Sequence, residues 1–527
     1  MRVANGVEPP TARFELMQVI ANGQSLSVGQ VMTTCLSTTQ PYQNVKLFDA
    51  SGSYLLSAPK ASTLSLIPLV APLRTEAIIF ELYPGNILGE TVEVSMANEM
   101  TRLAARAGIP RFRVHGTCTG ITGAQYVYIC KGGIWTSYAA GIFECQALAS
   151  GSANGGLAKS TGANSFGVGY SLFTHGESDA SLGIAPGVYC QDIVNMQANY
   201  DADCRAITGQ TSSIPMIFSQ QNSCPLSFAQ NNVTALDQLA AFVALPRLLL
   251  CSGPKYQYTY NPADRVHLLD YRPLGEKSAQ VAIANELYLA GRGPGWSPLY
   301  PTSVVRVGTT ITITFNVPVG DYSVSPAQPY KSLGPLVFDV TRSAPHQVGS
   351  PFAMWAAGNG LEYGDTPLTL SLATGVGVSP IVYTCASTAN LITGQKLAIY
   401  GQAIVSSPAS RGVFTITVIN STQFSLNGTI GNESNVGGVA FAFAPIGITS
   451  AVIVGNTVVM QVARAPITGG FVGNAHHSDV DYTSFTGGFP DGRCSLLRDS
   501  DPYVANGPLG SNFTNYNWSC EFQMTVS

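Results

Sequence analysis

The chain has 527 residues, enough for about two to four domains with substantial hydrophobic cores. Only 11% of the residues are charged, whereas 54 are glycine and 32 are proline, a composition typical of many turns, short strands and a weakly charged surface. The net charge of -4 offers no basic surface for phosphate contacts, which argues against nucleic acid as a partner.

The sequence contains no recognisable export or membrane segment. Residues 1–20 lack the basic stretch, apolar core and small-residue cleavage site of a secretory signal, and no uninterrupted apolar run reaches membrane-spanning length. The 11 cysteines are scattered without a Cys-x-x-Cys pair, which argues against a structural zinc site and defines no disulfide framework. We therefore expect a protein made in a cytoplasm, with reduced thiols.

The first predicted element is an apolar strand within residues 17–29, MQVIANGQSLSVG. The strand breaks at Asn22 and Gly23 and is followed by Ser25 in a turn of small residues. Such a strand end can hold a hydroxyl beside free backbone N–H groups, although a serine there is more often a turn or cap residue. Ser25 is therefore a candidate nucleophile that needs support from other motifs.

The next segments indicate the start of an α/β domain. Two strands joined by a turn are predicted over residues 45–56, and loop or mixed structure over residues 62–83. A helix is predicted over residues 91–108, because apolar residues recur there at helical spacing and Thr91 can cap it. Gly89 precedes this helix and can offer its N–H to an anion, or can simply let the chain turn.

Residues 110–120, PRFRVHGTCTG, are predicted to form the next parallel strand. His115 lies inside that strand, and we interpret it as a hydrogen-bonded structural residue. Over residues 126–167 the pattern indicates a long aromatic and glycine-rich loop. Long irregular segments inside compact domains are commonly functional, so we interpret this one as a lid-like insertion.

A second motif, THGESD at residues 174–179, follows an apolar strand predicted over residues 170–173. Open α/β sheets bind their ligands at the carboxyl ends of strands, where these polar groups would lie. A helix, a buried strand within residues 214–223 and another helix follow. Strands that alternate with helices over about 300 residues predict an α/β fold with a mostly parallel sheet and helices on both faces.

The third motif, NPADRVHLLDY at residues 261–271, combines a carboxylate with an imidazole. Asp264 and His267 lie close enough for the carboxylate to orient one ring nitrogen while the other accepts a proton from a hydroxyl. Asp-x-x-His also occurs by chance in exposed turns. Its position after the last predicted strand, and the order Ser, Asp, His along the chain, favour a catalytic role together with Ser25.

The four blocks IANGQSLSVG, ILGET, THGESDA and DRVH resemble those of the SGNH hydrolases, in particular the sialate O-acetylesterase and carbohydrate acetylesterase branch. The blocks of that branch read roughly GQSN, G, QGESD and DxxH, in the same order. The resemblance covers about residues 14–290 and implies a flavodoxin-like three-layer fold. The segment does not resemble the α/β-hydrolase elbow, because GQSLS lacks the second glycine of Gly-x-Ser-x-Gly.

The resemblance also implies a Ser-His-Asp triad with an oxyanion hole and no cofactor or metal. Ser25 would be the nucleophile, His267 the general base and Asp264 the residue that orients His267. The oxyanion would be bound by the backbone N–H groups of Ser25 and Gly89, with a third donor at His175. Three more residues would support the site without contacting the reacting atoms, namely Gln24, Glu177 and Asp179.

Two positions depart from the family pattern. His175 stands where the family has the Gln that begins QGESD, so that this donor would depend on the charge state of an imidazole. Leu26 stands where Asn is usual and removes another polar group. Both departures put the strength of oxyanion stabilisation in doubt.

The pattern changes after about residue 291, where GRGPG marks a boundary and alternating runs typical of antiparallel strands begin. We predict an SGNH esterase domain over residues 1–295 and a β-sandwich for carbohydrate binding or assembly over residues 296–377 and 444–527. A small β module is predicted as an insert at residues 378–443, and it resembles modules of bacteriophage tail proteins.

Two groups of side chains in this part give weaker hypotheses. Trp355 and Tyr363 could stack on a sugar, although packing in the core or at its rim is the commoner role of such aromatics. His476, His477 and Asp479 could bind a metal, but a surface loop is the commoner setting and no other spaced ligand is apparent. We therefore predict no metal site.

Three functions are compatible with the resemblance. The first is a bacteriophage tail spike or tail fibre on the virion tail, made in the host cytoplasm, which removes acetyl groups from a surface polysaccharide such as capsule or O-antigen. The second is a bacterial glycan acetylesterase of the xylan or sialate type, cytoplasmic or non-classically exported. The third is a non-catalytic receptor-binding adhesin. By analogy we expect a homo-oligomer, a trimer, that contacts other tail proteins, without nucleic acid or membrane insertion.

Overall fold

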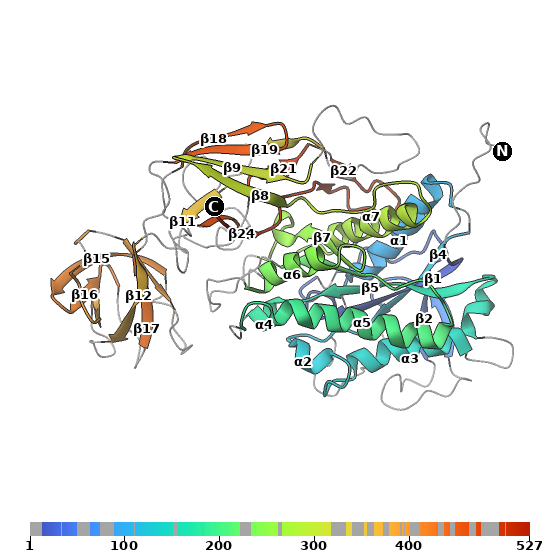
Figure 1. Cartoon of the computed structure of the whole chain (residues 1–527). Coiled ribbons are helices and arrows are strands. Elements are labelled where there is room, and N and C mark those ends of the chain that lie inside the picture. The colour runs from blue at the N-terminus through green and yellow to red at the C-terminus, as the bar shows by residue number, and fades with distance from the viewer. Residues whose placement is uncertain are drawn as a thin grey trace.

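The structure is a computed structural model in which one α/β body carries antiparallel sheets and a small barrel (Figure 1). It describes residues 13–32, 34–49, 64–73, 89–109, 111–150, 156–180, 182, 184–221, 233–261, 266–317, 334–339, 352–355, 363–372, 379–389, 391, 393–394, 396–400, 412–429, 437–442, 448–462, 471–475, 495–500 and 502–526.

The centre of the α/β body is a seven-stranded sheet in the order β3-β2-β4-β1-β5-β6-β7. Every neighbouring pair is parallel except β2 and β3. If β1, β4, β5, β6 and β7 are numbered 1 to 5 along the chain, their order across the sheet is 2-1-3-4-5, which is the flavodoxin-like order. The seven strands are β1 (Leu16–Gly23), β2 (Val45–Asp49), β3 (Leu64–Pro68), β4 (Arg113–Cys118), β5 (Phe166–Thr174), β6 (Met216–Gln220) and β7 (Leu249–Pro254).

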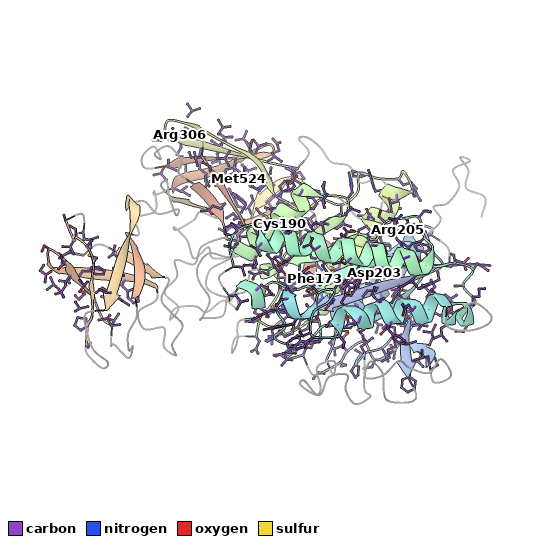
Figure 2. The ribbon with its side chains drawn as sticks, turned by 60° about the horizontal axis from the view of Figure 1, so that its bottom comes forward. Phe173, Cys190, Asp203, Arg205, Arg306 and Met524 are labelled. Atoms are coloured by element: carbon purple, nitrogen blue, oxygen red, sulfur yellow. The ribbon has the colours of Figure 1, made fainter. Side chains whose placement is uncertain are left out.

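Helices cover both faces of this sheet, so the predicted mostly parallel α/β architecture is confirmed. On one side α1 and α7 lie together, and on the other α3 and α5 lie side by side (Figure 1). Figure 2 shows α5, with Cys190 and Arg205 towards its two ends, running across that second face. The helices are α1 (Val92–Arg106), α2 (Tyr126–Ile129), α3 (Ser137–Ser150), α4 (Glu177–Ala180), α5 (Val188–Thr208), α6 (Val233–Ala244) and α7 (Arg272–Leu289).

The central strand β1 supplies apolar residues to both faces. Val19 packs in the core formed with α1 and α7, whereas Ile20 packs in the core formed with α3 and α5. Successive side chains of a strand point to opposite faces, so a strand covered on both sides buries the side chains of both faces, most of them apolar. All eight residues of β1 are buried, as a position in the middle of the sheet requires.

Two segments differ from the sequence-based predictions. Residues 64–68, expected to be loop or mixed, form β3, which pairs with β2 in antiparallel register, Leu66 opposite Leu47. Residues 137–150, expected to belong to a lid-like loop, form the helix α3. A Cβ atom on Gly141 of α3 would lie 2.7 Å from Ile20 Cγ2, so this helix packs directly on the sheet, and the lid interpretation is wrong.

The antiparallel part combines residues from both sides of the predicted insert. A four-stranded sheet has the order β18-β19-β9-β8, in which Ile313 of β9 pairs with Val458 of β19. Val472 and Phe522, from a three-stranded sheet β11-β20-β24, share a core with these residues, and β10-β21 and β22-β23 form two short pairs. The strands are β8 (Pro301–Val307), β9 (Thr310–Phe315), β10 (Leu336–Phe338), β11 (Phe352–Trp355), β18 (Ile448–Val454), β19 (Thr457–Val462), β20 (Phe471–Asn474), β21 (Leu497–Asp499), β22 (Tyr503–Val504), β23 (Thr514–Asn515) and β24 (Phe522–Thr525).

The inserted module is a closed barrel in the order β12-β13-β16-β15-β14-β17. Its core contains Ile381, Tyr383 and Phe424. The insert was predicted to begin at residue 378, but β12 already belongs to the barrel. The prediction therefore placed one barrel strand in the surrounding sandwich. The strands are β12 (Tyr363–Leu372), β13 (Ile381–Thr384), β14 (Lys396–Tyr400), β15 (Gly412–Asn420), β16 (Gln423–Leu426) and β17 (Gly437–Ala442).

The C-terminal segment returns to the α/β body. Gln220, at the end of β6, donates through Nε2 to the Glu521 carbonyl at 2.8 Å and accepts the Glu521 N–H at 2.7 Å. Trp518 packs edge-on against the ring of Tyr256, which follows β7. The β-rich part and the α/β body therefore share a polar and aromatic contact at the carboxyl ends of β6 and β7.

Among the helices of the described residues, none combines the length and apolarity needed to cross a bilayer.

Candidate active site

The parallel sheet has its change of strand order between β1 and β5, and the Ser25 turn and the 174–179 motif leave the sheet at this point. In open α/β sheets, ligands bind outside the carboxyl ends of the strands at such a switch point. Ser25 lies two residues after β1, in a turn closed by a hydrogen bond from Ser27 N–H to the Gln24 carbonyl at 2.8 Å. The fold therefore locates both motifs where this class of sheet binds ligands.

Among the residues that the structure describes, the side chain and N–H of Ser25 have no hydrogen-bond partner. Ser25 is 5% exposed, and within the described part of the chain neither its hydroxyl nor its N–H makes a hydrogen bond. Its carbonyl, in contrast, accepts the N–H of Gln30 at 3.1 Å, which closes the turn. The Ser25 hydroxyl therefore makes no hydrogen bond within the described ranges that would compete with a general base, which a serine nucleophile also needs within hydrogen-bond reach.

Residues 89–91, which precede α1 and are called the Gly89 loop here, lie directly against the Ser25 turn. A Cβ atom on Gly89 would be 2.4 Å from the Gly29 carbonyl oxygen, and the next residue, Glu90, donates its N–H to the Met32 carbonyl at 3.2 Å. The N–H of Gly89 makes no hydrogen bond to any residue of the described ranges. The close approach explains why glycine stands here, and its N–H can serve a developing oxyanion.

The His267 segment is tied to the same turn through Tyr271. The Tyr271 hydroxyl donates to the Gln30 carbonyl at 2.8 Å and accepts the N–H of Leu268, the residue after His267, at 3.4 Å. His267 itself is half-buried, and its carbonyl accepts the Asn261 N–H at 2.7 Å. Gln30 thus links the turn of the proposed nucleophile to the segment of the proposed base. Ser25 and His267 make no direct hydrogen bond to each other in this structure.

Gln24 is hydrogen-bonded to the turn that follows β5. Its side-chain oxygen accepts the N–H groups of Gly176 at 3.3 Å and Ser178 at 3.0 Å, and its own N–H donates to the Thr174 carbonyl at 3.2 Å. Gln24 is 2% exposed. The residue before Ser25 is thereby fastened to the turn that follows β5.

His175 has a different environment from the one expected of an oxyanion donor. Its ring is fully buried, with Nε2 2.9 Å from the Ala124 carbonyl and Nδ1 2.6 Å from the Tyr189 hydroxyl. Since a carbonyl can only accept, Nε2 carries the proton and Nδ1 accepts from Tyr189. The one N–H of the neutral ring is therefore committed to Ala124, which differs from the predicted oxyanion contact. Burial lowers the pKa of His175 and favours this neutral form.

Glu177 and Asp179 are also buried and hold neighbouring segments. Glu177 forms an ion pair with Lys255, whose side chain is fully buried at the end of β7. Asp179 accepts the Tyr126 N–H at 2.9 Å, which ties α4 to the start of α2. Both residues therefore join the turn after β5 to neighbouring segments, and their role in a reaction stays a prediction.

His115 has the buried, hydrogen-bonded setting expected of a structural residue. Its Nδ1 lies 3.3 Å from Thr117 Oγ1, which in turn donates to Glu144 at 2.6 Å. Burial raises the pKa of Glu144 well above its usual value. This group lies between β4 and α3.

Several predicted residues lie outside what the structure describes. Asp264 is one, so that the proposed orientation of His267 stays a prediction. The hypothetical metal group of His476, His477 and Asp479 and the side chains of Trp355 and Tyr363 also fall outside it. Within the described ranges, no group of three or more His, Cys, Asp or Glu side chains is arranged to hold a metal ion.

Three contact residues were not predicted from the sequence, namely Gln30, Lys255 and Tyr271. Lys255 carries the clearest signal, because it directly follows the apolar run LLLCSGP in a chain with few charges. A lysine at the end of a buried strand needs a partner, and a buried carboxylate is the usual one. Gln30 and Tyr271 carry no such signal, since their hydrogen bond joins residues 241 positions apart.

Comparison with known proteins yields structural neighbours only. No protein-family model matches the chain, and no curated protein matches its sequence. The crystal structure of a carbohydrate acetylesterase from Xanthomonas citri matches at 11% identity and a TM-score of 0.47, over 96% of this chain and 80% of that one. A protein from Arabidopsis thaliana matches at 14% identity and a TM-score of 0.36, over 53% of this chain and 99% of that one. At these values neither neighbour transfers an activity to this chain.

Proposed function

We propose that this protein is a carbohydrate O-acetylesterase that acts through Ser25, His267 and Asp264. The observation that carries the proposal is the contact of three chain segments at the switch point of the sheet. Gln30 accepts a hydrogen bond from Tyr271 next to the His267 segment and donates one to the Ser25 carbonyl, while the Gly89 loop packs on the same turn. These segments carry three of the four sequence blocks, and the fourth block, THGESDA, holds Gln24 through the N–H groups of Gly176 and Ser178.

The substrate class follows from the resemblance of those blocks to the carbohydrate acetylesterase branch of the SGNH hydrolases. The low content of charged residues, 11% of the chain, is compatible with a polysaccharide as the substrate. The proposed reaction is therefore the removal of acetyl groups from hydroxyls of a polysaccharide.

The proposed mechanism is acyl transfer in two steps. Ser25 Oγ attacks the acetyl carbonyl carbon while His267 accepts the hydroxyl proton, and the N–H groups of Ser25 and Gly89 donate to the oxyanion. The intermediate expels the sugar oxygen, which takes the proton from His267, and acetyl-Ser25 remains. Water then attacks the acetyl group as His267 accepts its proton, and acetate leaves Ser25 Oγ, which regains a proton.

The test is acetate release by purified wild-type protein and by Ser25→Ala, with p-nitrophenyl acetate and acetylated polysaccharide as substrates. We expect Ser25→Ala to lose turnover while it still binds the glycan. Ser160→Ala is a matched control, because Ser160 is an exposed residue of the short 3-10 helix Leu157–Thr161, where its hydroxyl donates to the Leu157 carbonyl. Wild-type rates of acetate release by Ser25→Ala would contradict the proposal.

The choice among the three predicted functions can be tested with candidate natural substrates. Acetate release from capsule or O-antigen would favour a bacteriophage tail protein, whereas release from acetylated xylan or sialylated glycans would favour a bacterial glycan esterase. Glycan binding without acetate release from any substrate would favour a non-catalytic adhesin. The trimeric state and the contacts with other tail proteins stay predictions.

A further inference from the structure

A buried ion pair joins the turn after β5 to the end of β7. Lys255 Nζ contacts Glu177 Oε1, and the two side chains are 0% and 1% exposed. The partners are 78 positions apart in the chain, so the pair fixes one loop relative to another. Breaking such a pair by removing one partner leaves an uncompensated buried charge, which the structure around it must accommodate.

Glu177 lies between the two residues that hold Gln24. The N–H groups of Gly176 and Ser178 donate to Gln24 Oε1 at 3.3 and 3.0 Å, and Gln24 immediately precedes Ser25. A movement of Glu177 therefore moves the donors that hold Gln24. A displacement of about 1 Å at a reacting group can cost about a hundredfold in rate.

We infer that Lys255 is a positioning residue for Ser25, acting through Glu177 and the 176–178 turn that holds Gln24. The inference rests on the proposed function, because the position of Ser25 affects a rate only if Ser25 is the nucleophile. Lys255 is the cation in direct contact with Glu177, whereas burial lowers the pKa of the neighbouring His175 and favours its neutral form.

The test compares three variants. Lys255→Met removes the cation but keeps most of the side-chain volume. Adding Glu177→Gln to Lys255→Met also removes the buried negative charge, so this double variant should regain thermal stability. The matched control is Arg13→Met, which breaks the ion pair of Arg13 with Glu286, N to O distance 2.6 Å, at the opposite end of β1.

The first readout is labelling of Ser25 by a fluorophosphonate, whose amplitude reports the folded fraction and whose rate constant reports the position of the nucleophile. We expect the rate constant to fall by about tenfold to a hundredfold in Lys255→Met and to stay low in the stabilised double variant. Arg13→Met should lose stability or amplitude but keep the wild-type rate constant. Two results would overturn the inference. One is a double variant that regains the wild-type rate constant together with its stability. The other is an Arg13→Met variant whose rate constant falls as much as that of Lys255→Met.

The second readout is hydrogen exchange of the amides in residues 22–30 and 174–180, which needs no activity. We expect faster exchange there in the double variant than in Arg13→Met. Equal exchange in the two proteins would overturn the inference. If the fluorophosphonate does not label wild-type Ser25, the proposed function fails, while the exchange data still decide whether Lys255 fixes the Ser25 turn.

Discussion

Charged side chains are scarce in this chain, and several of those in the α/β body are buried beside a specific partner. Lys255 pairs with Glu177 near the Ser25 turn, whereas Arg13 pairs with Glu286 at the other end of β1. The desolvation cost of a buried pair can exceed its Coulombic gain, so burial of both partners is weak evidence for a contribution to stability. At the level of single residues, the effect of each ion pair depends on which backbone segments it holds together.

Glu276 of α7 gives a prediction for how the stability of the protein depends on pH near neutrality. Its carboxylate accepts the N–H and the hydroxyl of Ser511, both at 2.6 Å, yet burial raises its pKa from 4.5 to about 7. The folded protein therefore binds more protons than the unfolded chain between these two values. The free energy of unfolding should fall as the pH rises through the folded pKa, by at most about 3 kcal/mol.

We expect Glu276→Gln to reduce this fall when urea unfolding is measured from about pH 5 to about pH 8. Glu15→Gln is a suitable control, because hydrogen bonds from Asn164 lower the pKa of Glu15, so Glu15 stays ionised over this range. Parallel pH profiles for wild type and Glu276→Gln would show that Glu276 does not titrate in this range.

His175 illustrates why a sequence block does not specify the role of each of its residues. The block implied a side-chain donor at this position, but the imidazole N–H is used by the Ala124 carbonyl. The ring also stacks on Phe173 and lies beside Tyr189. The backbone N–H groups of Ser25 and Gly89 are then the donors left for an oxyanion among those the resemblance implied.

At the level of elements, the strands and helices with a regular apolar period could be predicted from the sequence. The helix expected over residues 91–108 is α1, and the strand expected over residues 110–120 is β4. α3 was missed because its apolar, alanine-rich residues form no single face and both glycine and aromatic residues interrupt it. β3 was missed because its burial depends on pairing with β2, which short-range patterns do not report.

Short-range sequence patterns also identify only part of the candidate site. The four blocks identified Ser25, Gly89, the 174–179 motif and His267 as candidates, because each follows a strand or precedes a helix. The contacts that join these segments come from residues without a local pattern, such as Gln30 and Tyr271. Long-range hydrogen bonds of this kind depend on the folded arrangement of the chain.

The packing of α3 on β1 gives a prediction at the scale of elements. A Cβ atom on Gly141 would lie 2.7 Å from Ile20 Cγ2, closer than side-chain contacts allow, so Gly141→Val should push α3 away from the sheet. We expect a loss of about 1 to 3 kcal/mol, as for other overpacked cores. Ala139→Val, on the exposed side of the same helix, is the matched control in urea unfolding. Equal stabilities of the two variants would indicate that the helix is not held against β1.

At the scale of the whole molecule, the C-terminal segment makes the predicted boundary at residue 295 a poor place to cut the chain. Lys277 of α7 donates to Asn517 at 2.6 Å, and Gln220 makes two hydrogen bonds with Glu521. Trp518 also covers Tyr256, which is fully buried. A chain that ends at residue 295 would expose these groups at the carboxyl ends of β6 and β7, beside Lys255.

The barrel, in contrast, should be removable. Tyr363 and Ala442, at the two ends of the barrel, are register partners, so its entry and exit lie side by side and a short Gly/Ser linker can replace residues 363–442. We expect this deletion to keep the unfolding temperature of the α/β body and, under the proposed function, its rate of acetate release, whereas the chain ending at residue 295 should unfold at a lower temperature. Calorimetry and p-nitrophenyl acetate turnover of both proteins would check this. If the 1–295 chain matched the full-length protein, the C-terminal contacts would be dispensable for the α/β body and its site.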